Sequence, residues 1–168
     1  MNTGSPKDGL KEGNKMQDKK FVLRLATSRD AELLATWAQA MAMETEHKHL
    51  DAETVLKGVQ AGIADPKRAR YFIAMSGDTP AGTLMLTTEW SDWRNGDWWW
   101  IQSVYVHPDF RRQGVFQSLY RHVKEMAEQT DGVCGLRLYV EHENNNAQKT
   151  YESLGMEDAG YRMMEVLL

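Results

Sequence analysis

The most constraining stretch of the sequence joins a strand-like segment, a short turn and an amphipathic helix between residues 98 and 129. Residues 98–107 are rich in aromatic and β-branched side chains, and Pro108 cannot donate to a sheet ladder, so a strand is predicted to end near His107. Alternation along this strand predicts one face with Trp98, Trp100, Gln102, Val104 and Val106, and an opposite face with Trp99, Ile101, Ser103 and Tyr105. Apolar residues then recur at helical spacing, at Val115, Leu119, Val123 and Met126. The stretch predicts a strand that leads directly into a helix.

The hinge between this strand and helix, residues 111–116, has features of an anion-binding loop. The N-terminus of a helix carries unpaired N–H groups and a partial positive charge, which attract phosphate. Gly114 allows the backbone to approach a ligand closely, and Arg111 and Arg112 add fork-shaped charged donors. The alternative is a plain strand–helix connection with solvated arginines, and the hinge taken alone leaves both interpretations open.

Two motifs resemble those of the GNAT N-acetyltransferase superfamily. The hinge resembles the family's acetyl-CoA pyrophosphate loop, in which Gln or Arg is followed two residues later by Gly and then, after one residue, by Gly or Ala. Arg111 and Gly114 match, while Phe116 replaces the second small residue and is expected to crowd the loop or to turn outward along the cofactor. A second motif resembles the family's C-terminal signature, and its matching residues are Asn144, Ala147, Tyr151, Gly155 and Met156.

The resemblance implies a mixed α/β (α+β) fold over residues 21–168, as a single domain. Its central, mostly antiparallel sheet of six to seven strands is splayed between strands four and five and flanked by about four helices. The resemblance also assigns residues to acetyl-CoA binding: Val104, Tyr105, Val106, Arg111, Arg112, Gln113, Gly114, Val115, Phe116, Gln117, Asn144, Ala147 and Tyr151.

The local patterns elsewhere are consistent with that fold. Residues 1–20 are polar and are predicted to form a disordered leader. Strands are predicted over residues 21–25, 71–75, 81–90, 136–140 and 161–168, and further helices over residues 31–43, 51–63 and 146–154.

Composition excludes several classes of protein. Twenty Lys and Arg against 24 Asp and Glu give a net charge of −4, which argues against a nucleic-acid binder. No apolar run approaches the ~18 residues of a membrane span, and the N-terminus has no secretory pattern. A lone cysteine, Cys134, excludes an internal disulfide and suits a reducing, cytoplasmic setting. A homodimer is expected from the resemblance alone.

The acceptor site is expected around the loop between the first two helices and around the tryptophan-rich segment. The resemblance implies that Glu44 and Glu46 receive a cationic amine, although a solvated acidic turn remains an equal alternative. No metal is expected, because His47 and His49 lack a third ligand at a suitable spacing. Five of the six tryptophans lie within residues 90–100, more than one β-ribbon can bury. The residues predicted to bind the acceptor are therefore Glu44, Glu46, Trp93, Trp100 and Gln102.

The chemistry implied is direct attack of a small-molecule or peptide amine on the acetyl-CoA thioester in a ternary complex. Tyr151 holds the family's position for the acid that protonates the leaving thiolate, and backbone N–H groups near Tyr105 and Val106 are candidates for stabilising the oxyanion. Many family members carry a base near the position of Gln102, which cannot accept a proton. Glu89 is therefore favoured as the base. The alternatives are a bound water or Glu44, Glu46, Asp92, Asp97 or Glu141. A non-catalytic acyl-CoA-binding module on the same fold remains the second hypothesis.

Overall fold

The computed structural model describes residues 21–167, so the predicted leader over residues 1–20 lies outside the described residues. Within this part of the chain one sheet is formed, with the order β1-β2-β3-β4-β5. Its strands are β1 (Val22–Leu25), β2 (Arg70–Ser76), β3 (Thr79–Ser91), β4 (Gly96–Val106) and β5 (Val133–Arg137). The first four pair antiparallel, and β5 pairs parallel to β4, as expected for a strand that returns through a helix.

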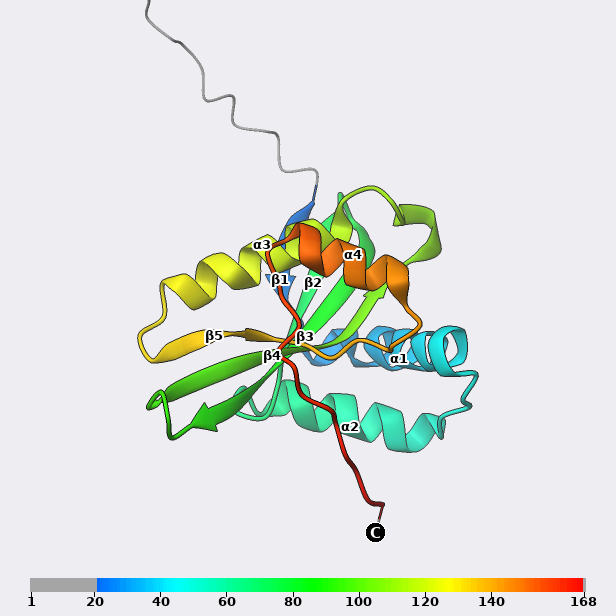
Figure 1. Ribbon diagram of the computed structural model, residues 1–168. Coiled ribbons are helices and arrows are strands. Elements are labelled where there is room, and N and C mark those ends of the chain that lie inside the picture. The colour runs from blue at the N-terminus through cyan, green and yellow to red at the C-terminus, as the bar shows by residue number, and fades with distance from the viewer. Residues whose placement is uncertain (1–20, 168) are drawn as a thin grey trace, which may run out of the picture.

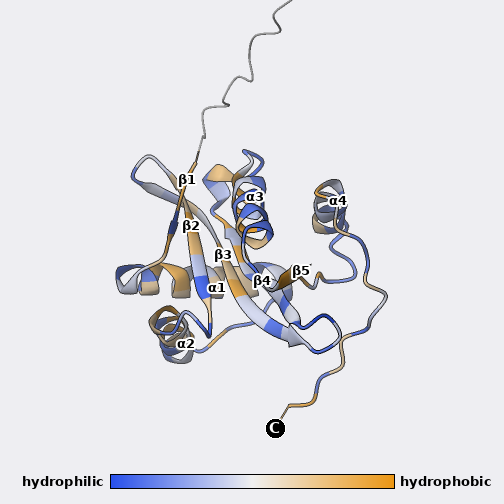
Figure 2. Ribbon diagram, turned by 90° about the vertical axis from the view of Figure 1, so that its left-hand side faces the viewer, coloured by the Kyte–Doolittle hydropathy of each residue, from blue (hydrophilic) through white to orange (hydrophobic). Residues whose placement is uncertain are grey.

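Helices cover both faces of this sheet (Figure 1). The α-helices are α1 (Ala31–Glu46), α2 (Ala52–Ala64), α3 (Val115–Glu128) and α4 (Asn145–Ser153), and short 3-10 turns lie at Ser28–Asp30 and Pro108–Phe110. α1 and α2 lie on one side of the sheet, and α3 and α4 lie on the other (Figure 2). Within residues 21–167, no helix is long and apolar enough to cross a membrane.

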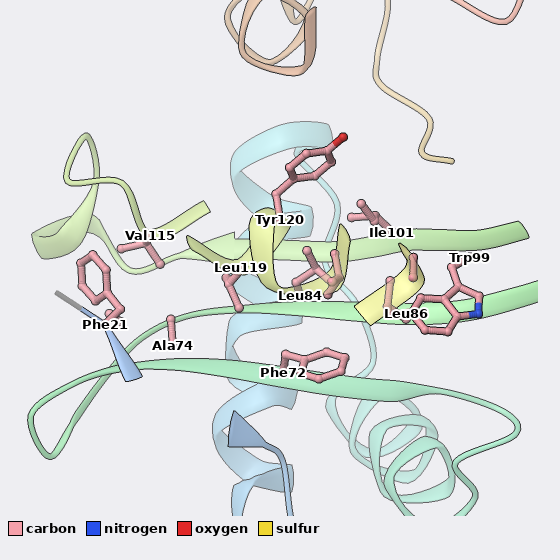
Figure 3. Packing of buried hydrophobic residues seen from close by; sticks show 13 residues of the cluster. Phe21, Phe72, Ala74, Leu84, Leu86, Trp99, Ile101, Val115, Leu119 and Tyr120 are labelled. Atoms are coloured by element: carbon pink, nitrogen blue, oxygen red, sulfur yellow. The ribbon is translucent and has the colours of Figure 1, made fainter. Parts of the chain in front are cut away.

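The main core lies between the sheet and α3 (Figure 3). Alternate residues of β3, Leu84 and Leu86, face Leu119 and Val123 of α3, which recur at the helical spacing seen in the sequence. Trp99 is only 4% exposed and belongs to this cluster. A second cluster joins α1 and α2 to the other face of the sheet and includes residues of both helices and of β2 and β4. β4 contributes residues to both clusters.

A β-bulge in β4 corrects the predicted alternation of its side chains. Met85 of β3 pairs with Gln102, but Thr83 pairs with Tyr105, so two residues of β4 lie opposite one of β3. Ser103, within this bulge, has φ 48°. The extra residue reverses the alternation. Tyr105 consequently packs in the cluster under α1, on the opposite face from Trp99, with which it was predicted to share a face.

The C-terminal part of the sheet differs from the prediction. The structure has five strands among residues 21–167, fewer than the six to seven expected. The fifth strand is Val133–Arg137 and not 136–140, because Asp97 pairs with Val133 and the last pair is Trp100 with Arg137. The strand predicted over residues 161–168 is absent from residues 161–167, where Tyr161 is 79% exposed. Its β-forming composition signals a preference, but a strand also needs a neighbouring strand to pair with its backbone.

Candidate active site

The centre of the site is the place where β4 and β5 separate. Their parallel pairing runs only from Asp97 and Val133 to Trp100 and Arg137, and beyond this point β4 continues to Val106 without β5 beside it. The separation confirms the splay that the family resemblance predicted. The backbone groups of residues 101–106 that do not pair with β3 therefore face the opening instead of a neighbouring strand, and the bulge at Ser103 lies within this part of β4.

The turn after β4 presents a concave backbone at the start of α3. Arg112 and Gly114 both have left-handed conformations, with φ 59° and φ 86°, and Gly114 is the N-cap of α3. Left-handed residues in such a turn point successive N–H groups toward one spot, which forms an anion-binding nest. The first N–H groups of α3 point the same way and have no acceptor within the helix. This geometry can accommodate a phosphate group, and the role predicted for residues 111–117 stays a prediction.

Arg111 links this loop to α1. Its Nε donates to the Val106 carbonyl oxygen at 3.1 Å, and its Nη2 donates to Glu44 Oε2 at 2.6 Å. The guanidinium carbon lies 5.8 Å from the centre of the Tyr105 ring. Burial, followed by the nearby Glu44 carboxylate, raises the pKa of Tyr105. The structure thus joins Glu44, predicted to bind the acceptor, to the loop predicted to bind the cofactor.

Tyr151 is held by the C-terminal motif on α4. Asn144 caps this helix by accepting a hydrogen bond from the Ala147 N–H at 3.1 Å. Burial raises the pKa of Tyr151 above the ordinary phenol value, which already leaves the hydroxyl protonated and able to donate a hydrogen bond at neutral pH. The Phe116 ring meets the Tyr151 ring edge-on, with centroids 5.5 Å apart, and also contacts Tyr120.

This contact gives Phe116 a role that the sequence did not indicate. Its ring is half-buried against the core and neither crowds the loop nor turns outward, because packing on two tyrosines removes it from water. Val115, also assigned to the loop, is buried in the core. Phe116 therefore links the first turn of α3 to the Tyr151 ring of α4.

A polar and aromatic patch lies farther along the sheet, on residues of β3, β4 and the end of β5. Gln102 Nε2 donates to Thr87 Oγ1, and Gln102 Oε1 accepts from the Tyr139 hydroxyl at 3.2 Å. Glu89 accepts a hydrogen bond from the Trp100 indole and pairs with Arg137. The structure therefore places Glu89 against Trp100 and Gln102 against Thr87 and Tyr139, on neighbouring parts of the same sheet face. Tyr139 and Arg137 were missed, although their alternation within the strand predicted over residues 136–140 was the available signal.

Other predicted residues lie apart from this patch. Trp93 is 85% exposed near the tip of the β3–β4 hairpin. Glu46 pairs with Lys48 in the loop after α1. Asp92 accepts a hydrogen bond from the Trp93 N–H. Among residues 21–167, no three His, Cys, Asp or Glu side chains gather as a metal site would require.

Comparison with known proteins identifies the family. The model of the Acetyltransferase (GNAT) family matches residues 31–156, a span that includes the splay, the turn and α4. The chain belongs to the GNAT acetyltransferase family. Members of this acyltransferase family use acetyl-CoA as the acetyl donor.

Solved structures show the same fold. A possible acetyltransferase from Clostridium difficile 630 is 40% identical, with a TM-score of 0.83 over 89% of this chain and 99% of that one. A predicted acetyltransferase from Clostridium acetobutylicum, solved with acetyl-CoA, shares the fold at 14% identity, with a TM-score of 0.71 over 87% of this chain and 96% of that one.

A curated relative has a named activity. The thialysine N-epsilon-acetyltransferase of Caenorhabditis elegans is 31% identical over 88 residues, which are 52% of this chain. The aligned region spans 54%, about half, of that relative's length.

Proposed function

We propose that this acetyltransferase binds acetyl-CoA between β4 and β5 and transfers the acetyl group to a primary amine by direct attack. One observation carries the proposal: the opening beside the Ser103 bulge leads directly to the concave turn around Gly114. The opening offers backbone groups to the pantetheine arm, as an added strand would use them, and the turn offers N–H groups to the pyrophosphate. The name of the Caenorhabditis elegans relative, an N-epsilon-acetyltransferase, supports an amine as the acceptor.

Tyr151 is the proposed acid. When the tetrahedral intermediate collapses, the carbon–sulfur bond breaks and the thiolate needs a proton or a hydrogen bond. Tyr151 carries its proton at neutral pH, as any phenol does, and the contact with Phe116 limits the directions in which the ring can point. Backbone N–H groups of the separated part of β4, near Tyr105 and Val106, are proposed to stabilise the oxyanion.

The proton of the attacking amine is proposed to leave through a bound water and not through Glu89. Glu89 is opposite Trp98 in the sheet, whereas Met85 is opposite Gln102 beside the bulge. Four residues of strand separate these two β3 positions, roughly 13 Å at 3.3 Å per residue. A general base must come within hydrogen-bond reach of the amine, and Glu89 is also engaged by Arg137.

The test is thiol release from acetyl-CoA with a panel of primary amines, for the wild type and Tyr151→Phe. The variant keeps the ring packing and loses only the donor, so kcat should fall about a hundredfold or more while the Kd of acetyl-CoA stays within about twofold. Tyr161→Phe is the matched control, because Tyr161 is exposed and lies outside the motif, which ends at Met156. An unchanged kcat in Tyr151→Phe would remove Tyr151 from the mechanism.

The second candidate function is non-catalytic binding of acyl-CoA. It is favoured by Gln102, whose side chain is engaged with Thr87 and Tyr139 and cannot take a proton. Calorimetry that shows acetyl-CoA binding, together with no thiol release with any amine, would support this function against the first.

A further inference from the structure

We propose that residues 161–167 of one copy of this chain, here named the C-terminal tail, bind as a strand beside β5 of a second copy. The two copies exchange their tails symmetrically and form a closed dimer. Within residues 21–167, one edge of β5 has no strand beside it, and the tail, whose composition favours a strand, belongs to no sheet. Exchange supplies the missing partner of both.

β5 offers a place for an added strand. It is the last strand in the sheet order, so one edge pairs with β4 while the other pairs with no strand of the described residues. A groove of about 450 Å³ lies between β5, α3 and the chain that follows α4. The residues that line it include Tyr120, Lys124, Glu128, Cys134, Leu136 and Met156. An unpaired edge beside a groove can accept a strand from another chain, because the edge supplies backbone hydrogen bonds and the groove receives side chains.

The tail carries the side chains that such a groove would bury. Its large apolar residues are 66–89% exposed, and they are Tyr161, Met163, Met164, Val166 and Leu167. They occur on both faces of the extended segment, which is typical of a strand covered on both sides. In its own copy the tail leaves these side chains in water, so a partner that covers them is needed.

Charge and area favour a second copy as that partner. The tail carries Arg162 and Glu165, and the groove carries Lys124 and Glu128, so each side offers both signs of charge. At about 100 Å² of apolar surface per large side chain, two tails bury roughly 1,000 Å², and the grooves that receive them bury a similar area. The sum of about 2,000 Å² reaches the size of a stable dimer interface.

The direction of the chain favours exchange over a return to its own groove. Met156 lines the groove, but the C-terminal end lies away from α3 and α4 (Figure 1 and Figure 2). The pKa of Lys48, in the loop after α1, is raised first by Glu46 and also by Glu165 of the tail, which places Glu165 toward the opposite side of the sheet. A return to its own groove would require the chain to reverse within residues 157–160.

Analytical ultracentrifugation of the full chain tests the assembly. The wild type should be a dimer at micromolar concentration, and a chain truncated after Gly160 should be a monomer that keeps its circular dichroism, because the large side chains of the tail are exposed in their own copy. Met164→Asp should weaken dimerisation about a hundredfold, since it brings a carboxylate into an apolar contact. Trp93→Ser is the matched control: Trp93 is 85% exposed but lies outside the tail, so the dimer should persist.

Cys134 distinguishes exchange from a return within one copy. It is the only cysteine of the chain and it lines the groove, so Met164→Cys provides a single new thiol that can pair with it. After oxidation with diamide, exchange should give a covalent dimer on a non-reducing gel, and adding Cys134→Ser should abolish it. Because the register of the added strand decides which tail residue meets Cys134, Met163→Cys and Val166→Cys are tested in the same way.

The inference is overturned by a wild type that stays monomeric at micromolar concentration, by a dimer that survives truncation after Gly160, or by a disulfide that joins Cys134 to the tail within one copy. A covalent dimer that persists with Cys134→Ser also contradicts it, because the link would then join tail to tail. None of these measurements involves acetyl transfer, so the assembly and the proposed function are tested separately.

Discussion

Replacing Glu44 with Gln should tighten the binding of acetyl-CoA. In the free protein, the Arg111 guanidinium, which we propose binds the pyrophosphate, forms an ion pair with Glu44 at 2.6 Å. Both side chains are 43% exposed, so the pair is screened by solvent and contributes only about 0.2–1 kcal/mol. Releasing Arg111 from it should therefore lower the Kd by a factor between about 1.4 and 5.

Isothermal titration calorimetry with acetyl-CoA measures this change. Arg111→Gln should weaken binding about ten- to a hundredfold, because it removes charged hydrogen bonds to phosphate. Glu46→Gln makes the same change of charge at a residue paired with Lys48, and should have a smaller effect. The gain from Glu44→Gln should shrink at about 0.5 M salt. Weaker binding in Glu44→Gln, or the same gain in Glu46→Gln, would refute the reasoning.

Two further predictions concern the stability of the fold around the site. Asp30→Asn should lower the free energy of unfolding at neutral pH by up to about 2 kcal/mol, because hydrogen bonds from Arg24 lower the pKa of Asp30 from 3.8 to about 2. The folded-state pKa is depressed, so this stability is present above about pH 4 and is lost as the pH falls toward 2; urea unfolding that shows the same difference at both ends would contradict it. Gly82→Ala should destabilise the fold by about 1–3 kcal/mol and weaken acetyl-CoA binding, because its Cβ would lie 2.8 Å from both the Tyr105 carbonyl oxygen and Val115 Cγ1. Unfolding and calorimetry of this variant measure both effects. Wild-type values in both would show that the atoms around Gly82 move aside at no cost in stability or binding.

The local elements and the family were accessible from the sequence. Helical spacing predicted α3 and its buried face, because the 3.6-residue period is a property of the chain itself. Arg111 and Gly114, with the motif around Tyr151, carried the resemblance that the family comparison confirms. These signals lie within short segments, where the spacing of residues alone carries the information.

The sequence did not predict in the same way which side chains share a face of β4. Alternation predicted that Tyr105 and Trp99 share a face, and the bulge at Ser103 separates them. Nothing in the residues around Ser103 distinguishes a bulge from a regular strand. The prediction of a final strand over residues 161–168 was wrong for a related reason. Composition shows that a segment favours the strand conformation, but not whether another strand is available to pair with it.

The sequence by itself determined the strand–turn–helix unit, the glycine-containing turn that we propose binds the pyrophosphate, and the presence of a tyrosine on α4. Only the tertiary structure decided which distant side chains meet: Arg111 with Glu44, which is 67 residues away, and Arg137 with Glu89, which is 48 residues away. The physical reason is the distance along the chain over which each feature is determined. Backbone conformation and helical or strand periodicity depend on near neighbours, whereas ion pairs and ring contacts across the sheet depend on register, on the bulge and on where β4 and β5 part.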